Sequence, residues 1–273
     1  VSRQAKQENT IINIGDCKIG SGETFAVIAG PCSIEGIKMM DEIWGSIKST
    51  GIHIMRGGAY KPRTSPYSFQ GMGIEGLEII KKIKNKYNIH FVTEVMDTKD
   101  IELIEEYADI LQVGARNIQN FNLLKEVGKS NKPVLLKRGM ATTIKEFLMA
   151  AEYILSGGNH NVILCERGIR TFETITRFTL DISAVPVIKK ESHLPVFIDP
   201  SHGGGRWDLV EPLSTAALAI GADGIIVEVH NDPEKAISDG AQSLKPDKFV
   251  EMMKNLSKII QFSKSTRIIL SLV

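Results

Sequence analysis

Eight short runs of β-branched and other apolar residues recur along this 273-residue chain. They are residues 25–30, 52–57, 90–95, 109–115, 133–139, 161–168, 195–202 and 224–230. The runs do not alternate apolar with polar residues, which is typical of strands covered on both faces in a parallel sheet. Each run is therefore expected to be a buried strand.

Helical periodicity appears in the segments between these runs. The clearest examples are residues 76–87, 98–108, 143–158 and 208–222. Three of these begin at Asp or Thr, and two of the three have Gly at or next to the last position, as capped helices do. Eight strand–helix units of this length fit a closed (β/α)8 TIM barrel, typically of about 250 residues, better than a doubly wound sheet. No G-x-G-x-x-G fingerprint follows the first run, which also disfavours dinucleotide binding.

A small N-terminal unit is expected ahead of the barrel. Residues 11–20 place β-type residues on both sides of a Gly-Asp turn, which predicts a hairpin that closes the barrel floor. The predicted organisation is an N-terminal segment with this hairpin (1–24), a catalytic barrel (25–262) and a C-terminal tail (263–273).

Charge and composition limit the classes of partner. The net charge of +1 argues against a nucleic-acid binder, which usually has a strongly basic face. No apolar run approaches the roughly 20 residues that span a membrane. Three cysteines without a signal peptide suit a reducing compartment. A cytoplasmic protein with no nucleic-acid or membrane partner is expected.

Reactive side chains collect at the carboxyl ends of the predicted strands. They are Cys32, Arg56, Lys61, Arg116, Lys137, Arg138, Glu166, Arg167, Asp199, His202, Glu228 and His230. In a TIM barrel this end is the catalytic face, so residues far apart in sequence converge there.

The first group that should converge is cationic. It comprises Arg56, Lys61, Arg63, Arg116, Lys137 and Arg167. Like charges in a partly dry cavity repel one another unless an anion lies among them, and a phosphorylated, carboxylated substrate or two phosphorylated substrates would supply that anion. Alternatively, several of these side chains point outward or pair with Glu94, Glu166 or Asp199.

The second group consists of Cys32, His202, Glu228 and Asp239. A thiolate, an imidazole and two carboxylates suit a divalent transition metal such as Mn, Fe, Co or Zn. No sequence spacing links these four, so only the barrel makes them neighbours. Taken singly, Cys32 could be a small buried residue and His202 could bridge backbone groups in a turn.

Seven motifs together resemble one enzyme family. They are AGPCSIE (29–35), RGGAYKPRTSPYSFQG (56–71), QVGARNIQNF (112–121), LLKRG (135–139), ILCERGIRT (163–171), DPSHGGGR (199–206) and EVHNDPEKAISDGAQSL (228–244). In this order they resemble the β subclass of type I 3-deoxy-D-arabino-heptulosonate 7-phosphate (DAHP) synthases. The resemblance implies the condensation of phosphoenolpyruvate with erythrose 4-phosphate and water, the first step of the shikimate pathway.

The resemblance also implies roles for individual residues. Cys32, His202, Glu228 and Asp239 become the metal ligands. The phosphate of phosphoenolpyruvate is expected to bind to Arg116, Lys137 and Arg167. Its carboxylate side is expected to bind to Arg56 and Lys61. The aldose phosphate is expected to bind to Arg63, Thr64 and Ser65. Lys61 is the expected proton donor or water-orienting group, with Glu94 or Asp239 as proton acceptor. A homotetramer is the oligomer that the resemblance suggests.

Three alternatives stay open at this point. The sister enzyme that makes 3-deoxy-D-manno-octulosonate 8-phosphate from arabinose 5-phosphate carries KANRSS where this chain has KPRTSP (61–66), which favours the four-carbon aldose. An aldolase that uses Lys137 as a Schiff base is a second alternative. A barrel retained as a binding module without turnover is the third.

Overall fold

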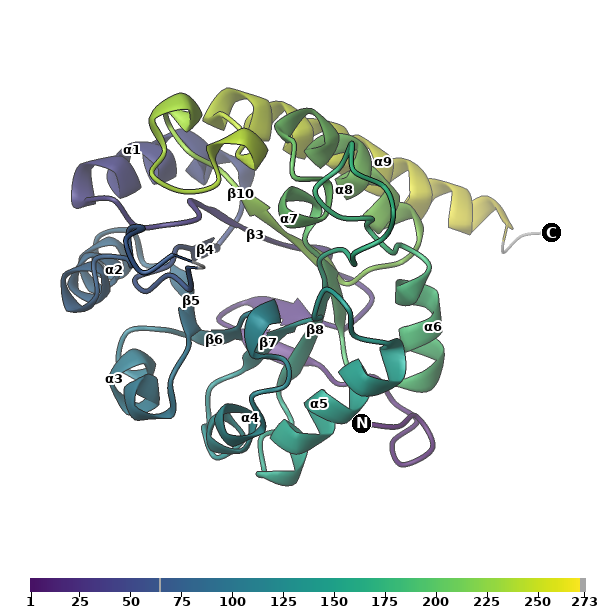
Figure 1. Ribbon diagram of the computed structural model, residues 1–273. Helices are drawn as coiled ribbons and strands as arrows, with labels where there is room; N and C mark the ends of the chain where they lie inside the picture. The colour runs from purple at the N-terminus through teal and green to yellow at the C-terminus, as the bar shows by residue number, and fades with distance from the viewer. Residues whose placement is uncertain (64, 271–273) are drawn as a thin grey trace.

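The computed structural model describes residues 1–63 and 65–270, with side chains through residue 262. Within these residues, eight parallel strands form a closed barrel ringed by helices (Figure 1). The strands are β3 (Ala26–Gly30), β4 (Ile54–Arg56), β5 (His90–Val95), β6 (Ile110–Val113), β7 (Val134–Lys137), β8 (Val162–Glu166), β9 (Val196–Ile198) and β10 (Gly224–Glu228). They pair in chain order, and β10 closes on β3. The TIM barrel prediction is confirmed, and each strand lies within a predicted run.

The strands are buried on both faces, which explains the missing alternation in the sequence. Every strand contributes at least one large side chain to the interior, and these are Ile28, Ile54, Val92, Ile110, Leu135, Ile163, Phe197 and Ile226. Their chain neighbours, such as Ala29, Met55 and Leu136, point outward into a second apolar cluster shared with the helices. Inward and outward positions are both apolar, so no period of two is visible.

Helices follow most strands and cover the outside of the barrel (Figure 1). They are α1 (Ile37–Ile47), α2 (Ile74–Tyr87), α3 (Ile101–Glu105), α4 (Phe121–Val127), α5 (Ile144–Ser156), α6 (Ala184–Glu191), α7 (Pro200–Gly204), α8 (Val210–Ala219) and α9 (Pro246–Leu270). The predicted helices at 98–108 and 208–222 each begin with a 3-10 turn, η2 (Thr98–Asp100) and η4 (Trp207–Leu209). Thr143 and Glu146 form a capping box that starts α5.

The predicted N-terminal hairpin is confirmed as well. Strand β1 (Ile12–Ile14) pairs antiparallel with β2 (Cys17–Ile19). Ile12, Ile14 and Ile19 belong to the same buried cluster as the barrel interior, so the hairpin covers the amino-terminal end of the barrel. At its turn Gly15 has φ 55°, and a Cβ there would lie 2.3 Å from the His90 ring. Glycine is therefore required for this close approach.

The organisation into segments 1–24, 25–262 and 263–273 stays a prediction, and α9 runs across its second boundary. In the part of the chain that the structure describes, no helix is long and apolar enough to cross a membrane. All three cysteines are free thiols, and Cys32 and Cys165 are buried.

Candidate active site

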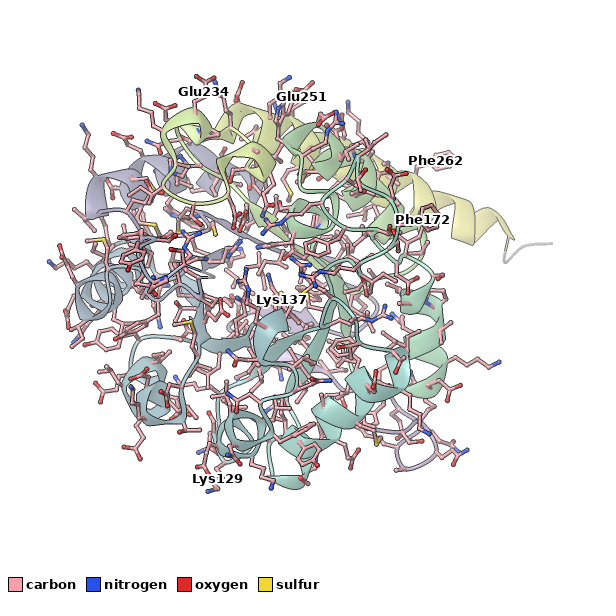
Figure 2. All side chains as sticks on the ribbon, in the orientation of Figure 1. Lys129, Lys137, Phe172, Glu234, Glu251 and Phe262 are labelled. Atoms are coloured by element: carbon pink, nitrogen blue, oxygen red, sulfur yellow. The ribbon has the colours of Figure 1, made fainter. Side chains whose placement is uncertain are left out.

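A cavity of about 490 Å³ opens at the carboxyl ends of the barrel strands. All six predicted cations, Arg56, Lys61, Arg63, Arg116, Lys137 and Arg167, line it. Figure 2 shows Lys137 near the middle of the ring of helices, whereas Lys129 lies on its outer edge. The barrel thus gathers into one mouth side chains that are more than 100 residues apart in sequence.

Two of these cations are paired with buried carboxylates below the cavity. The Lys137 ammonium lies 2.5 Å from Asp199 Oδ2, and Arg56 Nη1 lies 2.6 Å from Glu228 Oε1. Pairing of Lys137 with Asp199 was one of the alternatives raised by the sequence. The pairing leaves each cation in place at the cavity wall and fixes its position.

Arg167 is the cation best prepared for an anion. Its side chain is 5% exposed, its Nη1 is buried without a hydrogen-bond partner among the described residues, and its guanidinium lies 4.1 Å from the centre of the Phe178 ring. Burial lowers the pKa of Arg167 from its usual value. A buried unpaired donor is costly, and a phosphate or carboxylate oxygen would satisfy it.

Two further cations of the predicted set, Arg63 and Arg116, are less buried and lie nearer the opening. Arg116 is exposed and donates from Nη1 to the Pro62 carbonyl oxygen over 3.1 Å. Arg63 donates from Nε to the Phe69 carbonyl oxygen over 3.0 Å. Ser65 also lines the cavity, whereas Thr64 lies outside the described residues. The Arg116 contact joins the loop after β6 to the loop after β4, and the Arg63 contact lies within the loop after β4.

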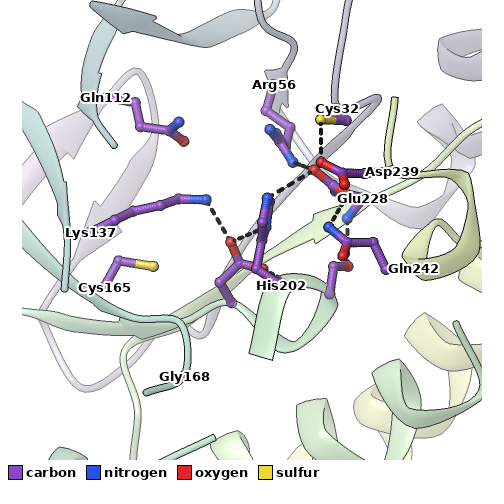
Figure 3. Close-up of polar contacts among 12 residues, drawn as sticks. Cys32, Arg56, Gln112, Lys137, Cys165, Gly168, His202, Glu228, Asp239 and Gln242 are labelled. Carbon is purple, nitrogen blue, oxygen red and sulfur yellow. Dashed lines mark hydrogen bonds and ion pairs between the residues drawn. The ribbon is translucent and has the colours of Figure 1, made fainter. Parts of the chain in front are cut away.

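The predicted metal ligands lie close to one another (Figure 3), and two of them, His202 and Asp239, line the cavity. Ligand atoms of Cys32, Glu228 and Asp239 lie within 4.8 Å of one another. Cys32 Sγ lies 3.1 Å from Asp239 Oδ2, and His202 Nε2 lies 3.5 Å from Glu228 Oε1. The four side chains come from the loop after β3, from α7, from the end of β10 and from the residue before η6 (Gly240–Gln242).

This donor set fits a divalent transition metal. Burial, with the negative charge of Glu228, raises the pKa of the Cys32 thiol to about 12. Burial opposes ionisation of Asp239 as well, but His202 and Arg177 outweigh it and hold the pKa of that carboxyl below its usual range. Without a metal, the Cys32 thiol keeps its proton beside two carboxylates. A divalent cation bound there would displace that proton, so that the sulfur would bind it as a thiolate.

His202 is oriented by a partner behind it. Its Nδ1 lies 2.7 Å from Asp199 Oδ2, close enough for an ion pair, and Asp199 Oδ1 accepts a hydrogen bond from the His202 backbone N–H over 2.9 Å. A carboxylate on one ring nitrogen leaves the other nitrogen available as a ligand atom. Asp199 therefore serves both His202 and Lys137.

Lys61 and Glu94 both line the cavity, and their side chains have different partners. The Lys61 ammonium lies 2.9 Å from Cys32 Sγ and 3.0 Å from the Cys32 carbonyl oxygen, and its side chain is 7% exposed. Glu94 Oε2 accepts from Gln112 Nε2 over 3.4 Å. Gly114 lies against Glu94 so closely that a Cβ there would be 2.0 Å from Glu94 Oε1.

Arg138 does not take part, although it follows Lys137 directly. Its guanidinium points away from the cavity to Glu166 Oε2 at 2.8 Å and Asp181 Oδ2 at 2.9 Å. Several cavity residues were not singled out from the sequence, among them Gln112, Arg170 and Arg177. The two arginines lie in the long loop between β8 and α6. They were not predicted because they do not stand directly at the end of a strand.

Comparisons with known proteins agree on one family. The profile of the DAHP synthetase I family matches residues 4–262. Phospho-2-dehydro-3-deoxyheptonate aldolase of Thermotoga maritima is 59% identical over 259 residues, which cover 95% of this chain and 76% of that protein. 2-dehydro-3-deoxyphosphooctonate aldolase of Geobacter sulfurreducens is 34% identical over 266 residues, covering 91% of this chain and 97% of that protein.

Solved structures give the same result. The crystal structure of the Thermotoga maritima phospho-2-dehydro-3-deoxyheptonate aldolase (DAHP synthase) superposes with a TM-score of 0.93 at 58% identity, covering 96% of this chain and 76% of that one. A truncated form of 3-deoxy-D-arabino-heptulosonate 7-phosphate synthase from Thermotoga maritima gives 0.89 at 54% identity, covering 96% and 95%. This chain therefore belongs to the DAHP synthetase I family.

Proposed function

We propose that this chain condenses phosphoenolpyruvate with erythrose 4-phosphate and water to give DAHP and inorganic phosphate. The observation that carries the proposal is a single cavity with a cationic wall beside a cluster of potential metal ligands. Two phosphorylated substrates need several cations, and the aldehyde of the second needs an electrophilic partner. The cavity offers both within one barrel mouth.

Phosphoenolpyruvate would lie against the four buried cations of the cavity, with the exposed Arg116 completing its phosphate site. We assign its phosphate to Arg116, Lys137 and Arg167, because Arg167 has an unpaired buried donor and Lys137 is held at the wall by Asp199. Arg56 and Lys61 would receive its carboxylate side. Arginine binds oxyanions through two parallel hydrogen bonds, and lysine supplies a compact charge.

Erythrose 4-phosphate would enter over the rim. We assign its phosphate to Arg63, Thr64 and Ser65 in the loop after β4, of which Arg63 and Ser65 line the cavity. The aldehyde end would then point inward toward Cys32, His202, Glu228 and Asp239. A divalent ion (Mn, Fe, Co or Zn) bound by these four would polarise the aldehyde carbonyl as a Lewis acid.

The chain's own residues would handle the proton transfers. As C3 of phosphoenolpyruvate attacks the aldehyde carbon, positive charge develops at C2, where water adds, and the hemiketal phosphate then loses phosphate. We assign to Lys61 the protonation of the new alkoxide or the orientation of the water, because its ammonium faces the ligand cluster. Glu94 or Asp239 would accept the proton released by the water.

The sister reaction with arabinose 5-phosphate is the second candidate, since the Geobacter sulfurreducens relative named above has the corresponding name. Identity of 59% against 34% and the KPRTSP motif favour the four-carbon aldose. The test is phosphate release from phosphoenolpyruvate with either aldose. We expect efficient turnover with erythrose 4-phosphate; faster turnover with arabinose 5-phosphate would reverse the assignment.

We also infer a homotetramer and a cytoplasmic location. The first rests on the family resemblance, and the second on the three free cysteines, which suit a reducing compartment. Light scattering coupled to gel filtration measures the oligomer directly.

A further inference from the structure

Gln242 lies beside the four candidate metal ligands without being one of them. It ends η6, three residues after Asp239, and is 2% exposed. Its amide is bound at both ends: Oε1 accepts from Arg177 Nη1 over 2.7 Å, and Nε2 donates to Glu228 Oε2 over 2.7 Å. Figure 3 shows its side chain reaching toward Glu228.

The chemistry of its partners fixes which way this amide faces. A guanidinium can only donate hydrogen bonds, and an ionised carboxylate can only accept them. The carbonyl oxygen of Gln242 must therefore face Arg177, and its NH2 must face Glu228. A turned amide would leave two buried groups without partners, which is costly in a water-poor site.

Gln242 helps to fix the orientation of the Glu228 carboxylate. Gln242 binds Oε2, Arg56 binds Oε1 over 2.6 Å, and the backbone N–H of Glu228 donates to Ser201 Oγ over 2.9 Å. With one oxygen held on each side, the carboxylate plane cannot rotate freely.

Arg177 extends the same control to a second carboxylate. The Nη1 atom that binds Gln242 also donates to Asp239 Oδ1 over 3.0 Å, while Cys32 Sγ donates to Asp239 Oδ2 over 3.1 Å. A continuous hydrogen-bonded path thus runs from Glu228 through Gln242 and Arg177 to Asp239. Two ligand candidates, one at the end of β10 and one before η6, are held in one arrangement by two residues outside the ligand set.

We propose that Gln242 is a positioning residue that orients Glu228, and through Arg177 orients Asp239, for a divalent cation. This rests on the proposed function only in taking Cys32, His202, Glu228 and Asp239 as the cation site. Residues that hydrogen-bond to metal ligands hold them in place before the metal binds, so the ligands lose less conformational freedom on binding. Removing such a residue typically weakens metal binding by about 10 to 100-fold. Gln242 therefore sets the affinity of the site.

The test is Co²⁺ binding by the full chain, measured by competition with a chromophoric chelator. Gln242→Met keeps the shape of the side chain and removes both hydrogen bonds. We expect its Kd for Co²⁺ to rise by about 10 to 100-fold, and the Co²⁺ concentration for half-maximal turnover to rise equally, with turnover restored at saturating Co²⁺. Gln119→Met, at an exposed glutamine, is the matched control and should bind as the wild type does. A folded Gln242→Met protein with wild-type Co²⁺ affinity would overturn the proposal.

A second variant covers the case in which Gln242→Met does not fold. Gln242→Asn keeps a buried amide but is one methylene shorter, so it cannot reach Arg177 and Glu228 together, and it should also weaken Co²⁺ binding. Wild-type affinity in this variant would overturn the proposal as well. The binding measurement needs no turnover, so a wild-type protein without condensation activity would refute the proposed function and leave this result standing.

Discussion

The Lys61 ammonium lies 2.9 Å from the sulfur of Cys32, which places the proposed proton donor directly against the proposed metal ligands. The Cys32 carbonyl oxygen, 3.0 Å away, holds the same ammonium. Cys32 thus anchors the lysine through its backbone and presents its thiol to Asp239.

Replacing Lys61 with methionine tests this arrangement. Lys61→Met keeps the length of the side chain and removes its proton and charge, so we expect turnover to fall by at least about a hundredfold with the fold intact. Steady-state kinetics and circular dichroism measure the two. Lys38→Met, at a lysine whose side chain is 90% exposed, is the control. Near-normal turnover of Lys61→Met would exclude the role.

Metal removal tests the ligand cluster. We expect a chelator to abolish activity and added Co²⁺ or Mn²⁺ to restore it, because the electrophilic partner of the aldehyde would be lost and regained. Cys32→Ser should weaken Co²⁺ binding and remove any sulfur-to-cobalt absorption band. Cys17→Ser, at the hairpin, should change neither. Full activity after complete removal of the metal would contradict the assignment.

Gly114→Ala tests the place of Glu94. A Cβ at Gly114 would lie 2.0 Å from Glu94 Oε1, so the carboxylate must move. We expect turnover to fall by about tenfold or more, since small displacements of reacting groups are costly, with little change in melting temperature. Gly45→Ala in α1, where a Cβ would meet no described atom within 4 Å, should leave turnover unchanged. Equal kinetics for the two variants would remove Glu94 from the proton path.

We expect the free energy of unfolding to decrease in mild acid because of His193. Burial lowers the pKa of His193 to about 4, with help from the N-terminal amino group and Lys6, and its Nδ1 is hydrogen-bonded to Thr10 Oγ1 at 2.8 Å. The unfolded chain binds this proton near pH 6.5, and the folded chain does so only near pH 4. The free energy of unfolding must therefore decrease as pH falls through that window.

Urea unfolding at pH 7.5 and pH 5 measures this effect. The wild type should lose more stability between these values than His193→Gln, whose side chain does not titrate. An equal loss in both proteins would mean that His193 is not the group responsible.

The sequence was informative where burial is uniform and less so in the loops. The eight strands were predictable because both of their faces are apolar, and the cations at their ends were predictable because the barrel sends every strand end to one mouth. Strand alternation also separates Lys137, which faces the cavity, from Arg138, which faces Glu166. Arg177 could not be located in this way, since its loop has no regular period and its position depends on Asp239 and Gln242.

The closure of β10 on β3 makes neighbours of Cys32 and Asp239, although 207 positions separate them along the chain. The ligand cluster therefore straddles the seam at which the ring of strands is sealed. An ion bound there would cross-link the segment after the first barrel strand to the segments at the last one. The same ion would then serve the reaction and stabilise the closed barrel.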